Sequence, residues 1–361
     1  MRYFLLFIVL AVTANFGVAQ SLTVSETPAA TNIGLHQYMI SGHQVSITNG
    51  ELALAGGTAA SSSINNVTAI SAALNNETAN VFAGNGDDLF SSSFDLEGGD
   101  SSARIYARLN GGFIIRENIA NFLFYNSMGE VEQSISNSSQ STEGESISEL
   151  AADPKFKTVV LYNPKIVSGG EEGSRAKLVR NDLTTTDIYY SSNRAIRNVE
   201  VSKNGQFMAI VTFSPGTEDI AIVTDRFGNV LSEISFDQNI EGVVLSESGE
   251  YVTLRSNGRV GVYSVLNGER VGSSSFRSRL LFAEFIPEDQ TIIALTATQS
   301  GSLLTNVEVH AINVAARAIQ RQNYSSELSM TDQIPLKLER IGSYNYMLSG
   351  LNKTLSLRAQ F

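Results

Sequence analysis

The chain has 361 residues, with 25 Lys and Arg against 36 Asp and Glu, and therefore a formal net charge of −11. A chain of this length can bury a large core without a disulfide or a metal to hold it together. It contains no Cys, which excludes disulfides, thiolate nucleophiles, iron–sulfur clusters and Cys-based zinc sites. The acidic balance argues against nucleic-acid binding, because neutralising phosphates requires clustered Lys and Arg.

Residues 1–19 have the pattern of a secretory signal peptide. Arg2 supplies a positive charge, and the run from Tyr3 to Val12 is apolar throughout. Small residues at Gly17 and Ala19 fit a cleavage site before Gln20. A transmembrane anchor is the alternative interpretation, but a spanning helix needs about 20 apolar residues, which this run does not reach.

The leader and the absence of Cys together predict where the protein works. Large secreted domains of the eukaryotic secretory pathway usually contain disulfides, so a Cys-free exported chain is typical of bacteria. We therefore expect a periplasmic or extracellular bacterial protein. No later apolar run reaches membrane-spanning length, so we expect no transmembrane segment after signal cleavage.

The segment 20–103 is rich in Ser, Asn, Ala, Gly and Thr, and its hydrophobic periodicity is weak. Within it, residues 44–54 alternate apolar and polar side chains around Asn49-Gly50, a typical hairpin turn. We expect this segment to be partly β and to contribute either closing strands or a first blade to the region that follows.

From residue 104 to the end, short apolar stretches alternate with turn residues, and a repeat is present. Val199–Ile210 and Val243–Leu254 share the pattern apolar-x-apolar-Ser-x-x-Gly-x-aromatic, followed by an apolar stretch. This pattern predicts two strands joined by a tight turn, with Gly205 and Gly249 at positive φ. Because Phe207 and Tyr251 occupy the same repeat position, we expect both rings to pack between repeats.

A second strand–turn–strand pattern follows each copy of the first, at Ile220–Ile234 and Val260–Val271. Each unit is thus four strands over about 40–50 residues, the size of one propeller blade. The pattern resembles the WD40-like and YVTN-type β-propeller superfamily. The Gly-His and Trp-Asp signatures of true WD40 repeats are absent, and the chain has no Trp.

The resemblance implies an all-β propeller of six or seven four-stranded blades, with the ring closed by N-terminal strands. The candidate blades are 104–136, 146–191, 195–236, 239–276, 280–322 and 334–361. A β-sandwich or barrel is the alternative, but a repeat of this length favours the propeller. The lack of long helical periodicity excludes a parallel α/β fold.

One acidic stretch is a weak candidate for a metal site. Ca²⁺ prefers carboxylate and carbonyl oxygens on a flexible loop, and the stretch from Gly84 to Asp100 is rich in acids and glycine. The candidate ligands are Asp87, Asp88, Asp95, Glu97 and Asp100. Their spacing does not match an EF-hand, so solvated loop acids are the simpler interpretation. No other cofactor is predicted.

A locally basic island is a weak candidate for partner binding. It consists of Arg175, Lys177, Arg180, Arg194 and Arg197. Such an island can receive an acidic partner. The alternative is that these are strand-edge charges, which discourage pairing with other sheets.

No catalytic residues are predicted. The chain has three His, and neither a Gly-x-Ser-x-Gly elbow nor a His-Glu-x-x-His motif is present. The first hypothesis for function is an exported non-enzymatic propeller that binds unidentified protein partners in the cell envelope, or serves there as a scaffold. The alternative is a propeller hydrolase or lactonase with a central divalent metal, held by polar side chains from several blades.

Overall fold

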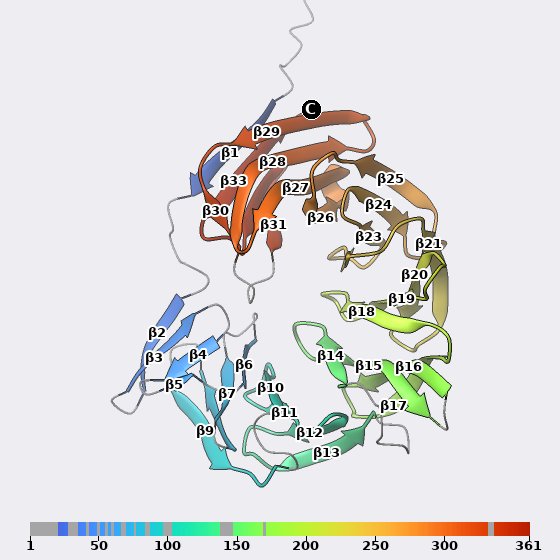
Figure 1. The fold of residues 1–361 in the computed structure, drawn as a ribbon. Coiled ribbons are helices and arrows are strands. Elements are labelled where there is room, and N and C mark those ends of the chain that lie inside the picture. Colours follow the sequence, from blue (N-terminus) through green and yellow to red (C-terminus); the bar gives the residue numbers. More distant parts are fainter. Residues whose placement is uncertain are drawn as a thin grey trace, which may run out of the picture.

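The computed structural model describes residues 21–27, 35–40, 43–48, 51–54, 57–58, 61–65, 70–75, 77–83, 87–96, 103–137, 147–168, 171–330 and 336–361. The leader predicted at 1–19 lies outside these residues. The described residues form seven four-stranded antiparallel sheets and one five-stranded sheet, arranged around a common centre (Figure 1). In the same part of the chain, no helix is long and apolar enough to cross a membrane.

The strands follow one another in chain order. The first nine are β1 (Ser21–Thr27), β2 (Leu35–Ile40), β3 (His43–Thr48), β4 (Glu51–Leu54), β5 (Gly57–Thr58), β6 (Ser61–Ile64), β7 (Ser71–Asn75), β8 (Thr78–Phe82) and β9 (Asp88–Ser93). The next twelve are β10 (Arg104–Ala107), β11 (Phe113–Arg116), β12 (Asn121–Tyr125), β13 (Val131–Ser136), β14 (Glu149–Ala152), β15 (Thr158–Ser168), β16 (Glu171–Arg180), β17 (Thr185–Ser191), β18 (Ala195–Val201), β19 (Phe207–Phe213), β20 (Asp219–Asp225) and β21 (Val230–Phe236). The remainder are β22 (Gly242–Leu245), β23 (Tyr251–Arg255), β24 (Arg259–Ser264), β25 (Arg270–Ser275), β26 (Leu280–Ile286), β27 (Thr291–Ser300), β28 (Leu303–Asn313), β29 (Ala318–Tyr324), β30 (Leu328–Ser329), β31 (Lys337–Gly342), β32 (Asn345–Ser349) and β33 (Thr354–Gln360), with a 3-10 turn η1 (Pro287–Asp289) after β26.

Seven sheets are built from consecutive strands, starting with β2–β5 and ending with β26–β29. In the last of these, the short strand β30 also pairs with β28. The eighth has the order β1-β33-β32-β31, so the ring is closed by strands from opposite ends of the chain. Ser21 lies opposite Gln360, and Thr27 lies opposite Thr354. The prediction that an N-terminal strand closes the ring is therefore confirmed.

The closing strand is also held by a polar contact. The Glu26 carboxylate accepts hydrogen bonds from Lys353 Nζ at 2.8 Å and from the Tyr324 hydroxyl. These two bonds lower the pKa of Glu26 to about 2. The contact links β1 to β29 in the neighbouring sheet and to the turn before β33.

The predicted all-β propeller of four-stranded blades is confirmed, with seven four-stranded sheets and one five-stranded sheet among the described residues. The segment 20–103 forms two four-stranded sheets, β2–β5 and β6–β9, in addition to the closing strand β1. Small side chains explain why this part was underestimated, because Ala72, Ala73 and Ala79 on β7 and β8 are fully buried but give a weak hydrophobic pattern. The division of the chain into a leader, an N-terminal segment and a repeat region stays a prediction.

The repeated turn has a local physical cause. Ser202 Oγ accepts a hydrogen bond from the Phe207 amide at 3.0 Å, and Ser246 Oγ accepts one from the Tyr251 amide at 3.1 Å. In each case the Ser side chain spans the turn between the first and second strands. The Ser of the repeat therefore satisfies a backbone donor that a turn would otherwise leave to water.

The glycine and aromatic positions of the repeat behave as predicted. Gly205 has φ +68° and Gly249 has φ +78°. A Cβ on Gly249 would lie 2.3 Å from a ring carbon of Phe207, so this ring covers the turn of the next sheet. The Tyr251 ring packs on Phe285 of the following sheet, with ring centroids 5.2 Å apart.

Where a sheet lies between two others, its inner strands are apolar on both faces, because β26, for example, contributes side chains to the cores on either side of its sheet. All seven residues of β26 are buried. Between the sheets β10–β13 and β14–β17, the core contains Ile114, Phe122, Phe124, Ile135, Val159, Leu161 and Val179. Burying a side chain of this size contributes about 1.5–3 kcal/mol, and stacking the sheets face to face is therefore the main source of stability.

One buried carboxylate joins the last two sheets of the chain. Asp289 is 3% exposed and accepts hydrogen bonds from Arg340 Nε at 2.9 Å, Arg340 Nη2 at 3.0 Å, the Tyr344 amide at 3.1 Å and the Tyr346 hydroxyl at 3.0 Å. Burial alone would raise the pKa of Asp289, but these bonds hold the pKa below its ordinary value.

Replacing Asp289 with Ala should lower the free energy of unfolding by about 2–4 kcal/mol, because the buried Tyr346 hydroxyl loses its partner. Urea denaturation measures this change. Asp88→Ala is the matched control, since Asp88 is exposed. A loss below about 0.5 kcal/mol for Asp289→Ala, the range of ordinary surface substitutions, would contradict this role.

Candidate functional site

The acids predicted as calcium ligands are only partly described. Asp87, Asp88 and Asp95 are exposed, while Glu97 and Asp100 lie outside the described residues. Across the described residues, no three His, Asp or Glu side chains are grouped so that they could hold a metal ion. The calcium site stays a prediction.

Two cations of the predicted basic island, Arg194 and Arg197, contact residues of the sheet β18–β21 and its loops. Arg194 donates to Thr212 Oγ1 and Thr212 O, each at 3.1 Å, and to Glu218 O at 2.8 Å. The Arg197 guanidinium lies 3.4 Å from the Asp219 carboxylate and 4.5 Å from the centroid of the Phe213 ring.

The other three cations of the island, Arg175, Lys177 and Arg180, lie on β16. Lys177 Nζ donates to Ser136 O of the preceding sheet at 2.7 Å, and burial lowers its pKa. Arg180 donates to Thr186 Oγ1 at 2.9 Å. Most of the island thus bonds within the fold, and its binding of an acidic partner stays a prediction.

The buried histidine is part of the packing. His310 Nε2 lies 3.0 Å from Thr296 Oγ1, and its ring centroid lies 4.8 Å from that of Phe276. Burial lowers the pKa of His310, although nearby Glu308 opposes this effect. The side chains of His36 and His43 are outside the part that the structure describes.

Two carboxylates that the sequence did not single out lie on the first strands of their sheets, Glu200 on β18 and Glu284 on β26. Glu284 is 8% exposed. Burial raises the pKa of each to about 7, and the charge of Glu284 adds to the shift of Glu200. Nearby Lys203 acts in the opposite direction on both.

The sequence does carry a signal for this pair. Each Glu interrupts an apolar strand, in Val199-Glu-Val201 and Ala283-Glu-Phe285. A carboxyl with a pKa near 7 can hold or release a proton at neutral pH, and such groups are concentrated at functional sites. Structural carboxyls are also perturbed in this way, so the shift by itself assigns no reaction.

A second feature is the side of the ring on which the hairpins lie. Because consecutive strands are antiparallel, the turn from first to second strand and the turn from third to fourth strand share one end of each sheet. Turns of neighbouring sheets also bond to one another, as Asn204 Nδ2 donates to Ser248 O at 2.7 Å and Arg180 Nη2 donates to Phe227 O at 3.3 Å. We call this side the hairpin face. It comprises turns 108–112, 126–130, 153–157, 181–184, 202–206, 226–229, 246–250, 265–269, 287–290, 314–317 and 343–344, with the strand residues that adjoin such turns.

Exposed large apolar side chains are unevenly divided between the two sides of the ring. Among the described residues, those at the hairpin face are Leu89, Met128, Val131, Phe227, Val230, Leu266, Ile319 and Ile341. Those at the opposite side are Ile147, Tyr190 and Leu303. The hairpin face is therefore the more apolar of the two, and it is the candidate binding surface.

Comparison with solved structures finds the same architecture. BamB from Moraxella catarrhalis aligns with a TM-score of 0.51 and 11% identity, over 93% of this chain and all of that one. The chain is a β-propeller. A chain of the mitotic checkpoint complex aligns with a TM-score of 0.48, 9% identity, and coverage of 82% of this chain and 88% of its own. KlHsv2, with loop 6CD replaced by a Gly-Ser linker, aligns with a TM-score of 0.47 and 10% identity, over 80% of this chain and 88% of its own. No protein-family model matches the sequence, and no curated protein matches it.

The raised pKa values of Glu200 and Glu284 predict how the propeller's stability depends on pH. Between the ordinary carboxyl pKa of 4.5 and about 7, the folded state binds more protons than the unfolded state, so stability falls as pH rises. We expect the variant Glu200→Gln/Glu284→Gln to have a higher Tm than the wild type at pH 8 and a flatter dependence of Tm on pH.

Thermal unfolding between pH 5 and pH 8 measures this effect. The control is Glu233→Gln, which changes an exposed carboxyl and should keep the wild-type slope. The interpretation is wrong if the double variant has the same slope as the wild type.

Proposed function

We propose that this propeller is an exported, non-enzymatic protein that binds a protein partner of the cell envelope through its hairpin face. The observation that carries the proposal is the concentration of exposed apolar side chains on that face. Large exposed apolar patches on soluble proteins mark interaction sites, and Met and aromatic residues are enriched at protein interfaces.

Met128, Phe227 and Leu266, which lie in turns of the hairpin face, are the proposed anchors for the partner. Met128 is 71% exposed, Phe227 is 54% exposed and Leu266 is 69% exposed. Each lies between the third and fourth strands of its sheet, where turn chemistry favours polar residues and Gly. Since none is buried by its own sheet, contact with a partner would remove apolar area from water at all three positions.

The turns that carry these side chains are held in place by neighbouring sheets. Arg180 donates to the backbone oxygen of Phe227, and Ser232 Oγ donates to Val265 O at 2.8 Å. The Arg226 guanidinium also lies 4.7 Å from the centroid of the Phe227 ring. A surface fixed in this way loses little conformational entropy when it binds.

Export rests on the leader pattern at residues 1–19 and on the absence of Cys. If the leader directs export, the protein recovered from outside the cytoplasm should begin at Gln20. N-terminal sequencing of the native protein measures this directly. A cytoplasmic protein that retains residues 1–19 would contradict export.

The apolar anchors can be tested with a pair of triple variants. Met128→Ser/Phe227→Ser/Leu266→Ser should weaken partner binding at least about tenfold, because a few buried anchors carry most of the energy of an interface. The matched control, on the opposite side of the ring, is Ile147→Ser/Tyr190→Ser/Leu303→Ser, which should bind as the wild type does.

Partners are first cross-linked to the mature protein in its native envelope and identified by mass spectrometry. Their dissociation constants are then measured for the wild type and both variants. Equal binding by the hairpin-face variant and the wild type, or equal losses in both variants, would refute the assignment of this face.

A further inference from the structure

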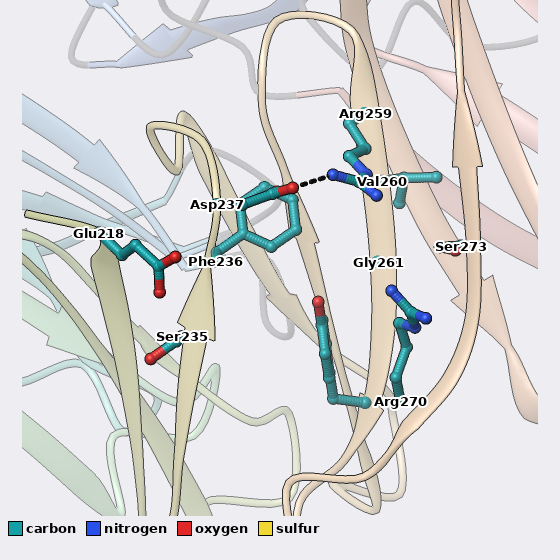
Figure 2. Close-up of a pocket in the computed structure, with 10 residues that line it drawn as sticks. Glu218, Ser235, Phe236, Asp237, Arg259, Val260, Gly261, Arg270 and Ser273 are labelled. Atoms are coloured by element: carbon teal, nitrogen blue, oxygen red, sulfur yellow. Dashed lines mark hydrogen bonds and ion pairs between the residues drawn. The ribbon is translucent and has the colours of Figure 1, made fainter.

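A cavity of about 210 Å³ lies between the sheets β18–β21 and β22–β25 (Figure 2). One wall is formed by the end of β21 and by the loop before β20, and the other by β24 and β25. It is smaller than the 300–1,000 Å³ typical of drug-sized ligands, so it suits one small molecule or one terminal group of a larger ligand.

A glycine lines the cavity at a position where other sheets carry a larger side chain. In four sheets the turn after the third strand is closed by the amides of Asn126, Arg180, Asp225 and Ser264. Three residues before each of these stand Leu123, Lys177, Ile222 and Gly261. The first three side chains reach toward the preceding sheet, where Leu123 and Ile222 pack against its core and Lys177 bonds to its backbone.

At Gly261 the backbone carries no side chain. Glycine in the interior of a strand weakens the strand, and it often marks a place where a ligand approaches the backbone. The Tyr263 ring takes the place of a side chain at this position, since a Cβ on Gly261 would lie 2.7 Å from a ring carbon of Tyr263 and 2.8 Å from its hydroxyl oxygen.

The Tyr263 hydroxyl is a polar group without a partner. The residue is only 9% exposed, and within the described part of the chain its hydroxyl makes no hydrogen bond. The hydroxyl lines the cavity and is free to donate a hydrogen bond to a ligand there. Burial also raises the pKa of Tyr263, so the hydroxyl stays protonated and able to donate.

Charged side chains of both signs surround the cavity. Arg259 is paired with Asp237. Arg270 lies opposite Tyr263 in the register of β24 and β25, and its guanidinium has no ion pair among the described residues. Figure 2 shows Glu218 and Arg270 on opposite sides of the cavity. The site thus offers an unpaired cation on one side and a carboxylate on the other.

We propose that this cavity binds a small polar carboxylate whose other end carries hydroxyl or amino groups. The carboxylate of the ligand binds between the Arg270 guanidinium and the Tyr263 hydroxyl, which both donate hydrogen bonds to it. The hydroxyl or amino groups donate to the Glu218 carboxylate across the cavity. A simple anion satisfies only half of the site and is repelled by Glu218. The binding site uses none of the three anchors on the hairpin face, so it does not depend on the proposed scaffold role.

Isothermal titration of the full mature chain with four probes tests this specificity. Glucuronate combines a carboxylate with hydroxyls, and glycylglycine combines a carboxylate with an ammonium. Acetate offers the carboxylate alone, and glucose offers hydroxyls alone. We expect glucuronate or glycylglycine to bind at least about tenfold more tightly than both acetate and glucose, and the tighter of the two tells a sugar acid from a peptide-type ligand. If neither exceeds acetate, the proposal is overturned.

Three single variants locate the binding. Arg270→Ala should weaken the better probe at least about tenfold, and Tyr263→Phe should weaken it several-fold, because each removes one donor to the carboxylate. The matched control is Arg358→Ala, an exposed arginine on β33, which should bind as the wild type does. Arg270 is exposed, so its loss should leave the Tm unchanged. Wild-type affinity in Arg270→Ala would overturn the assignment of the site.

Discussion

The pairing of β1 with β33 is the constraint on which the rest of the structure depends. Seven residues at the start of the described chain align with seven at its end, from Ser21 opposite Gln360 to Thr27 opposite Thr354. Leu22 on β1 enters the same core as Leu281 and Ala359, from the two sheets that meet there. Without β1 the eighth sheet would expose the edge of β33, and the core behind it would lose one wall. The entropic cost of bringing the two chain ends together rises only slowly with the length of the chain between them.

The ring arrangement also decides where function can be placed. Because the sheets repeat the same strand order, turns of the same kind lie on one side of the ring, and most of the exposed large apolar residues that the structure describes lie at those turns. The spaces between outer strands are a second kind of position. There, a large side chain such as Ile222 packs against the preceding sheet, whereas Gly261 lines a cavity beside the Tyr263 ring. The proposed binding surface and the cavity are thus both built from one repeated unit.

Much of the fold could be predicted from the sequence because its repeat is enforced locally. The Ser that spans each turn, the Gly at positive φ and the aromatic that packs on the next sheet, such as Phe207 on Gly249, are all visible as a pattern. The sheets before residue 104 were underestimated because alanines such as Ala72 can be fully buried without producing strong periodicity. Turns can therefore be predicted well from local sequence patterns, whereas packing by small side chains cannot.

The candidate sites were less predictable, because they depend on contacts between distant residues. Asp289 accepts hydrogen bonds from residues 51 to 57 positions away, and no local sequence motif predicts them. The cavity at Gly261 depends on Glu218 of another sheet, and the burial of Glu200 and Glu284 depends on how the sheets meet. Conversely, cations close together in the sequence, such as Arg194 and Lys177, bond to different parts of the fold.

The central claim is that the two ends of the chain close one cooperative ring. Native-state hydrogen exchange of the β1 amides, compared with those of β33, tests it most directly. The account predicts that the β1 amides bonded to β33 exchange with the same free energy of opening as the β33 amides, because the closed ring opens as one unit. Rapid exchange throughout β1, together with strong protection of β33, would show that the ring does not depend on its N-terminal strand.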